Sequence, residues 1–288
     1  MNVGTRVLLM TGLAVVTVSP ALAQAPPDRT PPPAVMQITR EEVKPGKDAA
    51  HEASEASWSA AYAKAQLQNG WLGMTTLSGP SEAWFLQGYA SWEELEKTTK
   101  AAQANEAYSA EAKRISPIDG DSLSRGSSIL AAYRPALSYN AGSNLAPRRY
   151  MQIRLIRVKP GRAREFADSV REDVAAHEKA KLEDSWAMYQ VASGMQDGTY
   201  IRLQAMTSLA ELDKSVPMHN AADFRDAMGE AGRTRAREMA QEAVEWSQTL
   251  LFAFNPKMTV APKAWMDADP FWAPKPAAPA AKPAEKKK

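Results

Sequence analysis

The chain has no cysteine and only three histidines among its 288 residues. The absence of cysteine excludes disulfide bonds, cysteine nucleophiles and thiolate metal sites, so the stability of the fold must come from an ordinary apolar core. Hydrophobic residues make up 44% of the sequence and include eight tryptophans, which is enough to build such a core.

Short motifs that identify common catalytic or nucleotide-binding sites are also missing. The sequence contains no GxGxxG, no GxxxxGK[ST] and no GxSxG. The histidines His51, His177 and His219 show neither HxxxH nor HxH spacing, and no carboxylate stands at an interval typical of metal ligands. The sequence therefore predicts no metal site formed by protein side chains.

No apolar run reaches the roughly 18 residues that a membrane-spanning helix requires. The longest run, Val7 to Val18, follows the single basic residue Arg6 and ends before Ala21-Leu22-Ala23. This order is typical of a secretory signal peptide over residues 1–23, with the mature chain beginning near Gln24. We therefore expect a periplasmic or secreted protein.

Both ends of the mature chain are rich in proline. Residues 24–33 form a proline-rich leader, and residues 261–288 form a Pro/Ala/Lys-rich tail. The net charge of +2 owes its sign to this tail, so the rest of the chain gives no argument for binding nucleic acid. The tail is either a solvated spacer or a weak electrostatic contact to an anionic envelope surface.

An internal repeat is the most informative feature of the sequence. At an offset of 115, residues 36–71 are identical to residues 151–186 at 14 of 36 positions, and both copies contain Val-Lys-Pro-Gly. Such self-similarity at a fixed spacing indicates a duplicated structural unit. We place the two units at residues 34–140 and 148–260.

Each unit reads as strand, helix, strand, strand, helix, strand. Proline and glycine in Lys-Pro-Gly end the first strand and free the turn into the first helix. This order is the ferredoxin-like βαββαβ plan, so the fold class is α+β. The predicted strands are Val35 to Val43, Trp71 to Leu77, Ala83 to Tyr89 and Ser128 to Tyr133, then Tyr150 to Val158, Trp186 to Ala192, Tyr200 to Met206 and Thr249 to Phe254.

The strand that ends in Val-Lys-Pro-Gly, the run Gln87 to Leu95 and a final strand that closes on Pro135 resemble the NIPSNAP-type branch of the dimeric α/β-barrel superfamily. Members usually pair two chains face to face. The resemblance therefore implies that the tandem copies form the whole barrel within one chain, and we expect a monomer.

Strand alternation suggests where a ligand would bind. Met151, Ile153 and Leu155 share one face, which we expect beneath the helices, and the opposite polar face should then look into the barrel. Arginines there require an acid or a bound anion, such as a carboxylate, as partner. The predicted ligand-binding residues are Gln37, Thr39, Gln87, Gln152, Arg154, Tyr189, Arg202 and Gln204.

Three functions fit these observations. The first is an exported barrel protein that binds a small, partly apolar and anionic ligand between its two sheets. The second, implied by the resemblance, is a cofactor-independent or haem-using monooxygenase, in which His177 or His219 would be the haem ligand. The third is a structural or interaction protein of the cell envelope without catalysis. Apart from haem in the second, we expect no cofactor.

Overall fold

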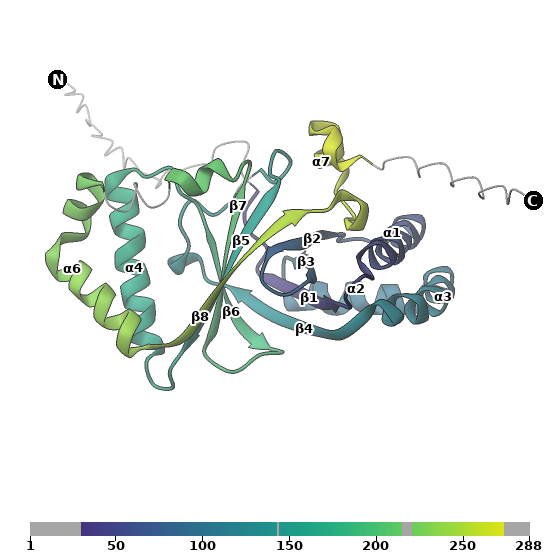
Figure 1. Ribbon diagram of the computed structural model, residues 1–288, viewed down its shortest axis with the longest axis horizontal. Coiled ribbons are helices and arrows are strands. Elements are labelled where there is room, and N and C mark those ends of the chain that lie inside the picture. Colours follow the sequence, from purple (N-terminus) through teal and green to yellow (C-terminus); the bar gives the residue numbers. More distant parts are fainter. Residues whose placement is uncertain (1–29, 143, 215–220, 274–288) are drawn as a thin grey trace, which may run out of the picture.

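The computed structural model describes residues 30–142, 144–214 and 221–273 (Figure 1). The proposed signal peptide, residues 1–23, lies outside them, as does most of the proline-rich leader. The first half contains β1 (Val35–Val43), α1 (Asp48–Lys64), β2 (Trp71–Ser78), β3 (Glu82–Tyr89), α2 (Trp92–Ala104), α3 (Glu106–Ser122), β4 (Leu123–Tyr133) and η1 (Pro135–Leu137). The second half contains β5 (Tyr150–Val158), α4 (Ala163–Ala180), β6 (Ala187–Ser193), β7 (Thr199–Met206), α6 (Ala222–Glu242), β8 (Val244–Phe254), η2 (Pro256–Met258), α7 (Lys263–Ala268) and η3 (Pro270–Trp272).

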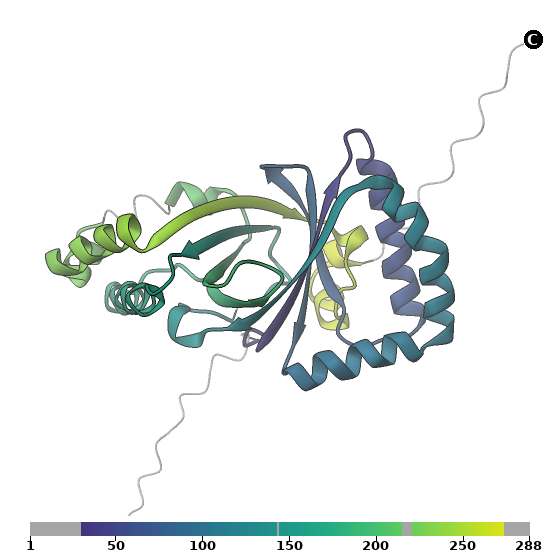
Figure 2. The ribbon, with the colours of Figure 1, turned by 90° about the horizontal axis from the view of Figure 1, so that it is seen from below.

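The strands form one closed antiparallel barrel in the order β1-β3-β2-β8-β5-β7-β6-β4. Its two halves join where β2 pairs with β8 and where β4 pairs with β6. The helices α1 and α3 lie together outside the first half, and α4 and α6 lie together outside the second (Figures 1 and 2). The expected α+β fold with an antiparallel barrel is confirmed, and the barrel closes within a single chain.

Local sequence signals explain the ends of several elements. Gly46 and Gly161, the glycines of the two Lys-Pro-Gly turns, have φ values of 77° and 84°, a backbone conformation that side chains disfavour. Ser91 caps α2 by accepting a hydrogen bond from the Glu94 amide at 3.1 Å. Among the described helices, none is long and apolar enough to cross a membrane.

The strand faces are the reverse of the sequence prediction. Met151, Ile153 and Leu155 do not lie beneath the helices. They belong to a buried cluster that also includes Met36 and Ile38 from the opposite half. Only the barrel interior brings these strands together, so the more apolar face of each strand looks inward and the polar face looks toward the helices.

Residues that the sequence assigned to the tail close one end of the barrel. Trp272 is 2% exposed and packs in the barrel cluster, where its Nε1 donates a hydrogen bond to the carbonyl of Ala146 at 2.7 Å. Asp269, which precedes Trp272 by three residues, forms an ion pair with Arg149. Residues 261–273, which follow the predicted end of the second unit at 260, therefore pack against the barrel.

Candidate functional site

The polar residues predicted to line the barrel interior in the second half lie on its helix-facing side. Arg202 Nη2 is 3.6 Å from Asp184 Oδ2, and its guanidinium stacks over the ring of Trp186 at 4.0 Å. Gln204 donates to Asp184 Oδ1 at 2.7 Å. Arg154 is exposed and lies opposite Arg202 in the ladder between β5 and β7. The partner of Arg202 in the structure is thus a protein acid, Asp184.

The remaining predicted ligand-binding residues fall in different places. Gln152, next to Arg154 on β5, alternates with the interior residues Met151 and Ile153 and so shares the helix-facing side. Tyr189 is in the barrel interior, and its hydroxyl donates to the carbonyl of Pro33 at 3.0 Å. Packing in the interior therefore accounts for the position of Tyr189. The other three predicted residues, Gln37, Thr39 and Gln87, lie on the helix-facing side of the first half.

His177 is fully buried among aromatic rings. Its ring centroid lies 4.8 Å from Trp186, 5.2 Å from Tyr139 and 4.8 Å from Phe224. Its Nδ1 is 2.8 Å from the carbonyl oxygen of Asp173, one turn earlier on α4. These contacts make His177 part of the packing between α4 and the sheet. His219, the other predicted haem ligand, lies outside the described residues.

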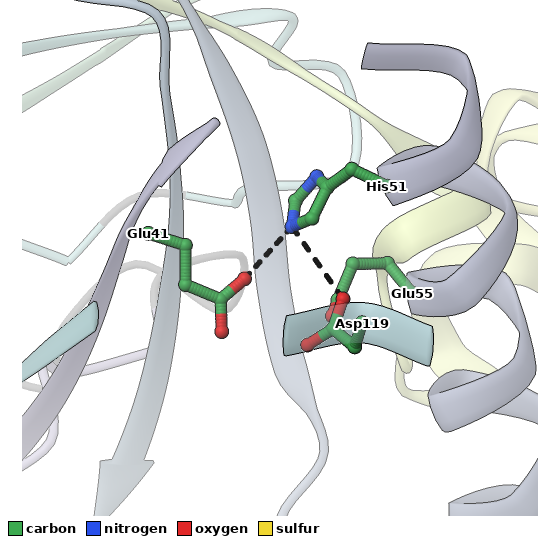
Figure 3. Close-up of side chains that lie close together, drawn as sticks. All are labelled: Glu41, His51, Glu55 and Asp119. Atoms are coloured by element: carbon green, nitrogen blue, oxygen red, sulfur yellow. Dashed lines mark hydrogen bonds and ion pairs between the residues drawn. The ribbon is translucent and has the colours of Figure 1, made fainter. Parts of the chain in front are cut away.

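The structure brings together four ionisable side chains that the sequence left apart: Glu41, His51, Glu55 and Asp119 (Figure 3). Each offers a ligand atom, and these atoms all lie within 4.8 Å of one another. His51 Nε2 is 2.8 Å from Glu41 Oε2 and 3.9 Å from Asp119 Oδ1. His51, Glu55 and Asp119 are buried, at 2%, 4% and 7% exposure.

Three elements hold this cluster in place. His51 and Glu55 are four residues apart on α1, so they lie on the same face of that helix. Glu41 comes from the helix-facing side of β1, and Asp119 from the last turn of α3. Ser54 fixes Asp119 by donating a hydrogen bond to its Oδ1 at 2.7 Å.

Burial strongly perturbs one member of the cluster. Desolvation, followed by the nearby carboxyl groups of Glu41 and Asp119, raises the pKa of Glu55 from 4.5 to about 9. Glu55 is therefore protonated near neutral pH in the absence of a bound cation. The proton on Glu55 reduces the negative charge of the cluster, and a bound metal ion could do the same in its place.

A cavity of about 240 Å³ adjoins the cluster, and Glu41 and Glu55 both belong to the cluster and line the cavity. It lies between the sheet of the first half and the helices α1 and α3. Its other lining residues are Thr39, Trp58, Trp71, Phe85, Gln87 and Tyr108. The predicted residues Thr39 and Gln87 thus do line a cavity, although it is not the one expected between the two sheets.

Two larger hollows occur elsewhere, and each contains an ion pair. At the open end of the barrel, a cavity of about 300 Å³ contains Arg40, whose Nη2 donates to both carboxylate oxygens of Glu82 at 3.0 Å. A groove of about 700 Å³ between α4 and α6 contains the ion pair Arg235–Glu172 at 3.0 Å. Among the residues that the structure describes, neither hollow adjoins a group of potential metal ligands like that at Glu41.

The second half provides an internal comparison. Ile156, Phe166 and Val170 occupy the positions in β5 and α4 that Glu41, His51 and Glu55 occupy in β1 and α1. Met239 stands three residues before the end of α6, as Asp119 does in α3. All four second-half residues belong to, or pack against, one apolar cluster.

Sequence reasoning missed this cluster, although one signal was present. Glu55 stands four residues after His51, an interval that places two metal ligands on one helical face, so the statement that no carboxylate has such an interval was wrong. A second signal is the difference between the two aligned segments, where the apolar residues Ile156, Phe166 and Val170 correspond to ionisable residues in the first half. Asp119 lies too far along the chain to be placed without the fold.

Comparison with known proteins identifies no family for this chain. No family model matches it, and no curated protein matches it. Among solved structures, it is similar to a suggested monooxygenase from Lactobacillus acidophilus (7% identity, 76% of this chain and 93% of that chain, TM-score 0.49). It is also similar to an anthrone oxidase-like protein (13%, 77% and 91%, TM-score 0.47) and to a chlorite dismutase variant from Candidatus Nitrospira defluvii (12%, 78% and 93%, TM-score 0.44). At such low identity and overlap, no residue role passes from these proteins to this chain.

Proposed function

We propose that this protein binds a divalent cation at Glu41, His51, Glu55 and Asp119 and takes a small, partly apolar molecule into the adjoining cavity. Three carboxyl groups and one imidazole are donors suited to Mn²⁺, Fe²⁺ or Zn²⁺. Ligand atoms held at about 2.0–2.2 Å from a metal lie at most about 4.4 Å apart. That limit holds for two ligands on opposite sides of the metal, whereas the ligand atoms of a tetrahedral site lie about 3.4 Å apart. The donor atoms of the cluster, which lie within 4.8 Å of one another, would therefore move together by up to roughly 1.4 Å on binding.

The observation that carries this proposal is the apolar counterpart in the second half. Ile156, Phe166 and Val170 give that half a continuous core between α4 and its sheet, so this architecture does not require polar groups at these positions. Burying ionisable groups is costly unless they are paired or hold a metal. Three acids around one imidazole are therefore better explained by a bound cation than by a structural need.

Direct metal titration tests the proposal. The purified mature protein, stripped with EDTA, is titrated with MnCl₂ and ZnCl₂ by isothermal calorimetry, with MgCl₂ for comparison. We expect one saturable site for Mn²⁺ or Zn²⁺. Because a ligating Glu55 must lose its proton, binding near neutral pH should release about one proton, visible as a heat that depends on the ionisation enthalpy of the buffer.

Two variants separate metal binding from folding. A fourfold replacement of Glu41→Ile, His51→Phe, Glu55→Val and Asp119→Met installs the residues of the second half, and it should fold and bind no metal. Glu172→Gln removes a carboxylate from α4, away from the cluster, and should bind metal normally. Unchanged binding by the fourfold variant, or the absence of saturable binding in the wild type, would overturn the proposal and leave a metal-free acid–base site.

The wider relationships of the chain are part of the same proposal. The chain is a tandem-duplicated, NIPSNAP-like protein made of two ferredoxin-like units, and it is exported and monomeric. The repeated Val-Lys-Pro-Gly turns, the same order of strands in both halves and the closure of the barrel within one chain support the duplication. Mass spectrometry of protein from the periplasm or medium, with Gln24 expected as the first residue, tests export.

A further inference from the structure

We infer that the cavity beside Glu41 and Glu55 takes an organic cation, a protonated or quaternary amine that carries an apolar group. This inference deepens the proposed function, since it names the ligand class for the same cavity. It does not depend on a metal being bound. It replaces the anionic ligand that the sequence suggested, because that expectation required Arg154 and Arg202 to face the binding site.

Half of the residues that line the cavity are aromatic. Trp58, Trp71, Phe85 and Tyr108 line it. The rings of Trp58 and Tyr108 lie 6.2 Å apart, and Tyr62 connects them to Trp71, with centroid distances of 5.6 Å to Tyr108 and 4.8 Å to Trp71. A cation within about 6 Å of such ring faces is attracted by their negative π-surface, and walls of this kind recognise quaternary ammonium groups.

The charge of the cavity has one sign. Among the residues that line it, Glu41 and Glu55 are the ionisable acids, and the set contains no lysine, arginine or histidine. Thr39 and Gln87 add neutral polar groups. In the metal-free protein a carboxylate ligand would face the carboxyl group of Glu41 and find no cationic side chain in the cavity lining, whereas an ammonium would meet acceptor oxygens and aromatic rings together. A divalent metal bound by three carboxylates and a neutral imidazole leaves the site with a net charge of −1. The cavity should therefore prefer a cationic ligand with the metal bound as well.

The size of the cavity limits the ligand. Its volume of about 240 Å³ lies just below the range of roughly 300–1,000 Å³ typical of sites for drug-sized molecules. A single ring with a short amine-bearing arm is of suitable size. Trp58, Trp71 and Tyr108 are each partly exposed, which gives such a molecule a route from solvent.

A matched series of small molecules tests this inference. Benzylammonium, benzyl alcohol and benzoate have nearly the same shape and differ in charge; phenyltrimethylammonium adds a cation that cannot donate a hydrogen bond. Each is titrated into the full mature protein by calorimetry, both after EDTA treatment and with Mn²⁺ present. We expect benzylammonium to bind at least tenfold more tightly than benzyl alcohol, phenyltrimethylammonium to bind measurably, and benzoate not to bind.

Variants distinguish the ligand class from the metal site. Tyr108→Leu and Trp58→Leu should weaken both ammonium probes at least fivefold while metal affinity stays within twofold, because neither ring belongs to the metal-ligating set. Glu172→Gln on α4 should change neither. Benzoate binding as tightly as benzylammonium, or ammonium binding unaffected in both aromatic variants, would overturn the inference and leave the metal result intact. Absence of metal binding by the wild-type protein, with ammonium binding retained, would instead overturn the proposed function and leave this inference intact.

Discussion

Replacing Glu55 with glutamine should remove most of the decline in stability that we expect for the metal-free wild-type protein as pH rises. The pKa of Glu55 is raised from 4.5 to about 9, so the folded protein keeps a proton that the unfolded chain releases. Stability from a raised pKa is complete below the unfolded value and is lost as pH rises through the folded value. The affected window therefore runs from about pH 5 to about pH 9.

The expected size follows from proton linkage. One group that is protonated only in the folded state lowers the free energy of unfolding by about 1.4 kcal/mol per pH unit. Between pH 5 and pH 8 the wild type should therefore lose up to about 4 kcal/mol relative to the Glu55→Gln variant. The glutamine amide can still donate a hydrogen bond toward Asp119, so the two proteins should have similar stability near pH 5.

Urea denaturation in buffers with EDTA, at pH 5, 6, 7 and 8, measures this difference. Glu172→Gln serves as the control, since its side chain is on the partly exposed surface of α4 in an ion pair with Arg235. The control curve should run parallel to that of the wild type. If the curve of Glu55→Gln also runs parallel to the wild type, Glu55 does not hold a proton in the folded state, and the electrostatic description of the cluster is wrong.

Three further predictions concern the rest of the fold. Arg202→Met should cost about 3–5 kcal/mol because it leaves buried Asp184 without its cationic partner. Arg154→Met, at an exposed position, should stay within about 0.5 kcal/mol in the same urea assay. Trp272→Ala should lower stability by about 3–5 kcal/mol in calorimetric melting, because Trp272 fills the end of the barrel core. Multi-angle light scattering should give the mass of one chain, and a stable dimer would contradict our proposal of a monomer.

The order and approximate extent of the strands were predictable because their signals are local. Lys-Pro-Gly ends both first strands, and short alternating segments flanked by turn residues mark the others. The last strand of each half was less well placed: β4 begins at Leu123 and β8 at Val244, both several residues before the predicted starts. Those early residues are mostly exposed and polar, so alternation gave no indication that they continue the ladder.

The orientation of the strands could not be read from alternation alone. The barrel wall buries residues on both sides, on the inner side against the opposite sheet and on the outer side against the helices, so a more polar face does not show which side it is. The closed interior takes Ile153 and Leu155, which are 0% and 1% exposed. The helix-facing layer reaches solvent at its edges, so it can accommodate Arg202 and Gln204 beside Asp184. Because Arg154 and Arg202 face the helices and not the barrel interior, the argument for an anionic ligand inside the barrel no longer holds.

The two halves of the chain differ in chemical character at the candidate site. Where two halves of the same architecture differ only in size or shape at a core position, packing is a sufficient explanation. At Glu41, His51 and Glu55 the difference is instead from apolar to ionisable, at three positions whose counterparts Ile156, Phe166 and Val170 form a continuous core. Random loss of packing would scatter polar residues over the layer. Their convergence on one point, with Asp119 and an aromatic-walled cavity beside them, is the arrangement that binding a cation requires.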